Sequence, residues 1–106
     1  MKKDKALALV DLLVLKGICH RGLHNDIYPE NSLGAFNNAI IHNLAFELDI
    51  HLTLDGYLVV CHDSNLLRAT GKDGLIEELT LRKIKEEYQL FDGSEIPTLE
   101  EVIDLN

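Results

Sequence analysis

The chain has 106 residues, of which 46% are hydrophobic and 26% charged, and its net charge is −8 with histidine neutral. Such a length allows one small domain, and the hydrophobic content excludes a generally disordered chain. The longest near-apolar stretch, residues 6–15, is interrupted by Asp11, whereas a membrane-spanning helix needs about 20 apolar residues. The acidic excess argues against a nucleic-acid partner. We expect a cytoplasmic protein without a transmembrane segment.

Helical propensity predicts a lead-in helix over residues 1–16, followed by a short strand over residues 17–20. A polar turn comes next, and Asn31 or Ser32 can cap the helix after it. Apolar residues then recur at spacings of three and four, which predicts a helix with one face on the core. These residues are Leu33, Phe36, Ile40 and Leu44.

Residues 45–52 alternate apolar and polar side chains, which predicts a single strand. Asp55-Gly56 is typical of a hairpin turn, and a second apolar strand follows over residues 57–61. A charged-faced helix is expected over residues 79–88. Thr98 and Glu101 have the spacing of a capping box, so a last helix begins there. The order strand–helix–strand predicts parallel pairing.

Glu47 and Asp49 lie two residues apart on the predicted strand, so their carboxylates project to the same side. A hard divalent cation would compensate the repulsion between these two carboxylates. The alternative is that both are ordinary solvated surface groups. His20, with Arg21 beside it, and His62 end the neighbouring strands. Histidine exchanges protons near neutral pH, so these residues together indicate a catalytic edge of the sheet.

Cys19 and Cys61, the two cysteines, each precede one of these histidines. The pairs resemble a Cys2His2 zinc site, but adjacent strand residues point to opposite faces. We therefore expect the cysteines to pack inside, away from the histidines.

Six segments together resemble the glycerophosphodiester phosphodiesterase family in order and spacing over about residues 17–105. They are His20-Arg21-Gly22, Pro29-Glu30-Asn31-Ser32 with Ala35-Phe36, Glu47-Leu48-Asp49, Thr53-Leu54-Asp55-Gly56, His62-Asp63 with Leu67-Arg68 and Thr70-Gly71, and Ile96-Pro97-Thr98-Leu99-Glu100-Glu101.

The resemblance implies an α/β fold, with residues 17–106 as the N-terminal portion of a TIM (β/α)8 barrel and residues 64–95 as the family's insertion near the site. A TIM barrel takes about 250 residues. We therefore expect either self-association or a need for the remainder of the barrel, with the chain incomplete as a domain.

The resemblance also implies the reaction, namely hydrolysis of glycerophosphodiesters to glycerol 3-phosphate and an alcohol. It implies His20 and His62 as the acid–base pair, Arg21 at the substrate phosphate, and Glu47 and Asp49 as ligands of Mg²⁺ or Ca²⁺. Glu30 and Asn31 are expected to support the site. A further metal carboxylate in this family comes from a later strand, beyond Asn106.

Two other functions stay open. One is a catalytically inactive module that binds only a metal, a phosphate or a partner chain. The other is a lysophospholipase D or sphingomyelinase D type of enzyme acting on lipids. Of the remaining histidines, His51 is a candidate to support the carboxylates, whereas His24 and His42 are expected to be exposed.

Overall fold

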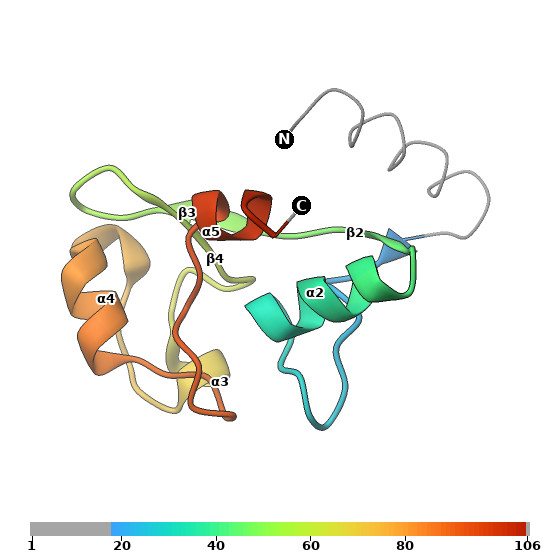
Figure 1. Cartoon of the computed structure of the whole chain (residues 1–106). Helices are drawn as coiled ribbons and strands as arrows, with labels where there is room; N and C mark the ends of the chain where they lie inside the picture. Colours follow the sequence, from blue (N-terminus) through green and yellow to red (C-terminus); the bar gives the residue numbers. More distant parts are fainter. Residues whose placement is uncertain (1–17, 106) are drawn as a thin grey trace.

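The computed structural model describes residues 18–105, so the helix expected over residues 1–16 lies outside the described residues. Strand β1 (Ile18–Cys19) pairs in parallel with β2 (Ala45–Phe46), and helix α2 (Leu33–Ile41) connects them (Figure 1). Ile18 lies opposite Ala45, and Cys19 lies opposite Phe46. The predicted strand–helix–strand unit with parallel strands is confirmed.

Helix α2 begins where the sequence predicted, because the Ser32 hydroxyl accepts a hydrogen bond from the backbone N–H of Ala35. Phe36 is buried as predicted, together with Ala35 and Ala39, whereas Leu33, Ile40 and Leu44 are half-buried. Gly22 lies so close to the helix that a Cβ there would be 2.9 Å from Ala35 Cβ, so this contact needs small residues on both sides.

The prediction of a single strand over residues 45–52 is wrong, because the backbone changes the strand to which it is hydrogen-bonded in the middle of this segment. Beyond β2, the Glu47 N–H still donates to Cys19 O of the first strand. From Asp49, whose carbonyl accepts from Cys61 N–H, the chain pairs on the other side. Strand β3 (Ile50–Leu52) is then antiparallel to β4 (Leu58–Val60), as the predicted hairpin at Gly56 requires. Glu47 and Asp49 therefore occupy the junction between two small sheets.

Strand β4 is buried on both faces. Val60 packs with Phe36 of α2 and Val102 in one core, while Val59 and Cys61 face a second core. The second core also contains Leu66, Ile76, Ile84, Tyr88, Leu90 and Ile96. Cys61 is thus a packing residue, as the alternation of side chains predicted, and burial raises the pKa of its thiol to about 11.

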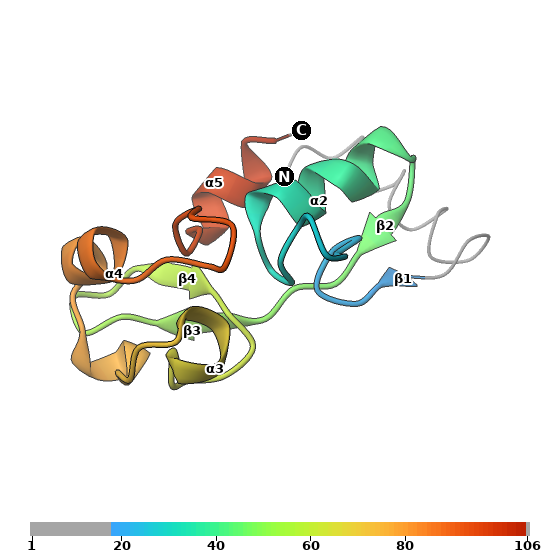
Figure 2. The ribbon, with the colours of Figure 1, turned by 90° about the horizontal axis from the view of Figure 1, so that it is seen from below.

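Four short helices complete the described chain: α3 (Leu67–Thr70), the 3-10 helix η1 (Ile76–Glu78), α4 (Leu81–Glu87) and α5 (Leu99–Ile103). The helix expected over residues 79–88 is α4, which starts at its Thr80 cap. Helix α5 has the predicted capping box between Thr98 and Glu101 and lies against β4 and α2 (Figure 2). Within residues 18–105, no helix is long and apolar enough to span a membrane.

Candidate active site

The loop after β1 places two candidate residues around one carboxylate. His20 Nε2 lies 3.7 Å from Glu47 Oε2, and the Arg21 backbone N–H donates to Glu47 Oε1 at 3.3 Å. Arg21 has a φ of 60° and Gly22 a φ of 84°, so the chain turns sharply here. A positive φ at a non-glycine residue stores strain, and such residues cluster at functional sites.

Asp49 is held from the same loop. Asn31 Nδ2 donates to Asp49 Oδ2 at 3.2 Å, and Arg21 Nε lies 3.9 Å from the same oxygen. Asn31 is only 3% exposed. Among the side chains of residues 18–105, the buried polar atoms without a hydrogen-bond partner are Arg21 Nε and Asn31 Oδ1. Buried polar atoms are seldom left unpaired, so a donor and an acceptor beside Asp49 are available to a polar ligand.

His62 lies two residues after the end of β4 and is oriented by its neighbour Asp63. Its Nδ1 lies 2.8 Å from Asp63 Oδ1, and Asp63 Oδ2 accepts from Arg68 Nε at 2.7 Å. These hydrogen bonds, first that of Arg68 and then that of His62, lower the pKa of the Asp63 carboxyl. The carboxylate is therefore ionised at neutral pH and can fix which imidazole nitrogen carries the proton.

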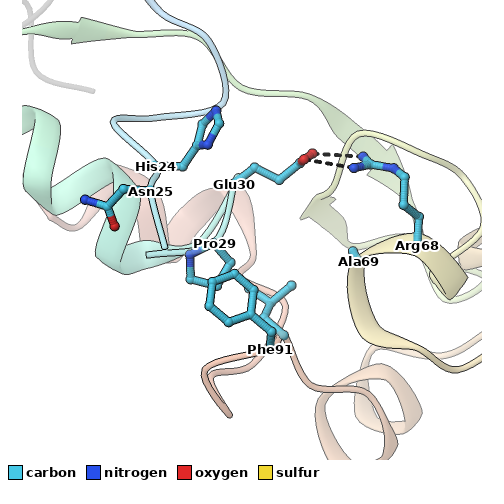
Figure 3. A pocket seen from close by; sticks show the side chains of 8 residues that line it. His24, Asn25, Pro29, Glu30, Arg68, Ala69 and Phe91 are labelled. Carbon is cyan, nitrogen blue, oxygen red and sulfur yellow. Dashed lines mark hydrogen bonds and ion pairs between the residues drawn. The ribbon is translucent and has the colours of Figure 1, made fainter. Parts of the chain in front are cut away.

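Glu30 joins the two groups of residues. Both of its carboxylate oxygens accept from Arg68, at 2.9 Å each, and Oε2 also accepts from Arg21 Nη1 at 3.0 Å. The hydrogen bonds from Arg68, aided by the charge of Arg21, lower the pKa of Glu30 to about 2 against the cost of burial. Figure 3 shows the Glu30 and Arg68 side chains reaching toward each other from separate segments.

A small cavity of about 190 Å³ lies beside this ion pair (Figure 3). Its wall combines the two charged side chains with apolar and polar groups from three segments. The lining residues are His24, Asn25, Pro29, Glu30, Arg68, Ala69, Leu90 and Phe91.

The structure thus links most of the residues that the sequence singled out. His20, Arg21, Glu30, Asn31, Glu47 and Asp49 are joined by direct contacts. His62 joins them through two residues to which the sequence reasoning gave no role, Asp63 and Arg68. Their signal was present, because both stand inside the matched segments His62-Asp63 and Leu67-Arg68.

The other histidines lie elsewhere. His51 pairs with Val59 in the β3–β4 hairpin, and its side chain contacts groups other than Glu47 and Asp49. Its Nε2 lies 3.0 Å from the backbone oxygen of His62, and its Nδ1 lies 3.7 Å from Glu77 Oε1. His24 and His42 are exposed, as predicted.

The carboxylates of Glu47 and Asp49 are hard oxygen donors of the kind that Mg²⁺ and Ca²⁺ prefer. Over residues 18–105, however, no three His, Cys, Asp or Glu side chains are grouped so that they could hold a metal ion. The two carboxylates therefore fit part of a coordination shell, the rest of which water, substrate or further residues would have to supply.

Two histidines, a guanidinium and two carboxylates at strand ends form the kind of site that can bind an anionic ester and exchange protons with it. The model of the Glycerophosphoryl diester phosphodiesterase family matches residues 20–106, and the chain belongs to this family. The resemblance noted in the sequence is confirmed.

Individual relatives support the same family assignment. The glycerophosphodiester phosphodiesterase of Caldanaerobacter subterraneus subsp. tengcongensis is 40% identical over 95 residues, which cover 83% of this chain and 39% of that protein. The crystal structure of a glycerophosphodiester phosphodiesterase from Thermotoga maritima matches with a TM-score of 0.72 at 41% identity, covering 84% of this chain and 38% of that one.

An Oleispira antarctica phosphodiesterase, solved with its product sn-glycerol-3-phosphate, matches with a TM-score of 0.75 at 33% identity and with coverages of 83% and 38%. The chain therefore spans about two fifths of the length of the relatives it matches. Its fold is the N-terminal portion of the family's TIM barrel, as predicted.

Proposed function

We propose that this chain carries part of the site of an enzyme that hydrolyses glycerophosphodiesters to glycerol 3-phosphate and an alcohol. The supporting observation is the position of Arg21, whose Nε is buried without a hydrogen-bond partner. Its Nη1 donates to Glu30, its backbone N–H donates to Glu47, and its Nε lies 3.9 Å from Asp49 Oδ2, so the guanidinium is held in place beside the two carboxylates. A guanidinium presented in this way suits a phosphate oxygen.

In this proposal His20 and His62 are the acid–base pair. One imidazole takes a proton from the attacking hydroxyl as its oxygen bonds to phosphorus, and the other gives a proton to the alkoxide that leaves as the P–O bond to the alcohol breaks. Water supplies the oxygen and the two hydrogens that hydrolysis adds. Because Asp63 occupies Nδ1 of His62, the Nε2 atom of that ring is the one left to exchange a proton. Asn31 supports Asp49 through its amide, and Glu30 supports Arg21.

Glu47 and Asp49 would hold the divalent cation, Mg²⁺ or Ca²⁺. When bound, such an ion neutralises charge on phosphoryl oxygens and polarises a neighbouring hydroxyl. The donor chemistry fits, since both side chains present carboxylate oxygens beside a buried, unpaired amide oxygen of Asn31.

Release of glycerol 3-phosphate from glycerophosphocholine, with Mg²⁺ or Ca²⁺ present, tests the reaction. His20→Ala and His62→Ala should each lower kcat by about 10²–10⁴-fold. His42→Ala is the matched control, because His42 is exposed and its ring, among residues 18–105, hydrogen-bonds only to Asn38 O. This variant should leave kcat unchanged. Full activity in both site variants would disprove the acid–base pair.

A thermal-unfolding titration with Mg²⁺ and with Ca²⁺ tests whether the chain binds a divalent cation. An ion present at about 100 times its Kd adds about 2.7 kcal/mol to the free energy of unfolding. Glu47→Gln and Asp49→Asn should abolish this gain, whereas Glu86→Gln, in an exposed pair on α4, should retain it.

A second function, binding of metal or phosphate without turnover, is favoured by the small number of grouped ligands within residues 18–105. The same two experiments separate the functions. Stabilisation by the cation with no release of glycerol 3-phosphate supports the binding module, and both together support the enzyme.

A further inference from the structure

We infer that Arg68 is a positioning residue that sets Arg21 and His62 relative to each other. This inference rests on the proposed function. Arg68 touches neither the candidate metal carboxylates nor either histidine in the contacts of residues 18–105, and instead acts through Glu30 and Asp63. It lies in α3, near the start of the segment expected as the insertion (residues 64–95), and connects α3 to two separate parts of the site.

The geometry of Arg68 is specific to a guanidinium. Its Nη1 and Nη2 donate to the two oxygens of Glu30 in a parallel pair, while its Nε donates to Asp63. Bidentate pairs of this kind fix orientation as well as distance. A lysine ammonium is a single point charge on a flexible stem and cannot hold both carboxylates in this arrangement.

On one side, Arg68 fixes Arg21. Glu30 Oε2 is shared between Arg68 Nη2 and Arg21 Nη1, so the carboxylate stands between two guanidinium groups. The Arg21 side chain is thereby held at Nη1, while its buried Nε lies 3.9 Å from Asp49 Oδ2. Without Arg68, Glu30 would keep only Arg21 as a charged partner and could rotate with it.

On the other side, Arg68 fixes His62. The Asp63 carboxylate divides its two oxygens, Oδ1 to His62 Nδ1 and Oδ2 to Arg68 Nε. A carboxylate that holds one imidazole nitrogen selects the tautomer with the proton there and sets the plane of the ring. Since Asp63 itself is only partly buried, the Arg68 bond is what restrains it.

A plain surface ion pair is the competing explanation, because the Arg68 side chain is 49% exposed. Such pairs contribute little to stability and do not orient distant groups. The chain offers a matched control in Arg82, which pairs with Glu86 one helical turn away and is 85% exposed. The variants to compare are therefore Arg68→Gln, Arg68→Lys and Arg82→Gln.

The first measurement is kcat and KM for glycerophosphocholine, together with Tm. Loss of a supporting group commonly costs 10–100-fold. We expect Arg68→Gln to lower kcat by about that factor when every variant is assayed well below its own Tm. Arg68→Lys should retain only a part of the kcat of the parent chain, whereas Arg82→Gln should have the same kcat as the parent chain. In a further variant, Arg68→Ala, methylguanidinium added to the buffer should restore kcat in part.

The second measurement needs no activity. The ¹⁵N signals of the neutral His62 ring report whether the proton is on Nδ1 or Nε2. We expect Nδ1–H in the parent chain and in Arg82→Gln, and a mixture of tautomers in Arg68→Gln. If Arg68→Gln does not fold, the change in the His62 tautomer is measured in Arg68→Lys, which retains the positive charge.

The outcomes separate this inference from the proposed function. If the parent chain has no activity but the His62 tautomer depends on Arg68, the positioning role stands and the function fails. If the parent chain is active and neither kcat nor the His62 signals differ between Arg68→Gln and Arg82→Gln, the positioning role is wrong. A fall in kcat that only follows a fall in Tm, with unchanged His62 signals, also overturns it.

Discussion

The backbone N–H of Asn31 donates to the carbonyl oxygen of Arg21 at 2.8 Å, and both residues have a positive φ, 56° and 60°. Two strained residues from the two ends of one loop thus hold each other in place. Asparagine adopts this conformation more readily than most residues, and glycine adopts it at no steric cost.

The first prediction separates the backbone role of Asn31 from that of its amide. Asn31→Gly and Asn31→Ala both remove the hydrogen bond to Asp49, but only alanine carries the steric cost of a positive φ, about 1–2 kcal/mol. Asn31→Gly should therefore unfold at higher urea concentration than Asn31→Ala, by about 1 kcal/mol in free energy. Equal stabilities, or a more stable alanine variant, would contradict the strained loop.

The second prediction concerns the glycine after Arg21. A Cβ at Gly22 would lie 2.9 Å from Ala35 Cβ and 3.0 Å from Ala35 C, whereas a Cβ at Gly93 would meet nothing within 4 Å. Both glycines have nearly the same φ, 84° and 85°. Both alanine variants therefore pay the same backbone cost, and Gly22→Ala should lose about 1–3 kcal/mol more through overlap with α2. Urea denaturation of the two variants side by side checks this, and equal losses would show that α2 can shift away.

Local chemistry made much of this architecture predictable from the sequence. The cap at Ser32, the turn at Gly56 and the capping box at Thr98 each depend on residues within four positions of one another. The candidate residues at strand ends followed from the same local patterns and from the order of the matched segments.

Two features could not be predicted because they depend on distant parts of the chain. The strand over residues 45–52 is divided because Glu47 pairs with one strand and Asp49 with another, which no periodicity reveals. Arg68 reaches Glu30 across 38 positions in the sequence. Only the packing of α3 near the loop after β1 brings these two charges together.

The third prediction is self-association of the chain. Apolar side chains gather on the β3–β4 hairpin with 40–65% of their surface exposed: Ile50, Leu52, Leu54, Tyr57 and Leu58. Leu52 and Leu58 are cross-strand partners, so these two exposed side chains lie side by side, and exposed apolar surface of this kind commonly marks an interface. We expect a dimer or larger species in light scattering, and Leu52→Lys should shift it toward monomer. Leu67→Lys, at an exposed leucine on α3, is the control. A monodisperse monomer of the unmodified chain would refute this prediction.

The fourth prediction follows from the lowered pKa of Glu30, which falls from 4.5 to about 2 through its bonds with Arg68 and Arg21. A carboxyl whose pKa is lower in the folded state stabilises the fold above its unfolded pKa, and this stabilisation disappears as pH falls through the folded pKa. The contribution of Glu30 should be complete above about pH 4.5 and lost toward pH 2. Its size is roughly 2–3 kcal/mol, because each pKa unit corresponds to about 1.4 kcal/mol and Arg68 is partly screened by solvent.

Chemical denaturation of the parent chain and of Glu30→Gln between about pH 2 and 7 measures this contribution. The parent chain should be the more stable by that amount near neutral pH, and the two curves should converge as the pH falls. Glu86→Gln, which removes one negative charge from an exposed pair on α4, controls for net charge. Asp63 also has a lowered pKa, so both proteins lose its stabilisation in acid. If the difference in the free energy of unfolding between the parent chain and Glu30→Gln stays constant down to about pH 2, Glu30 is not held as an anion by the two arginines.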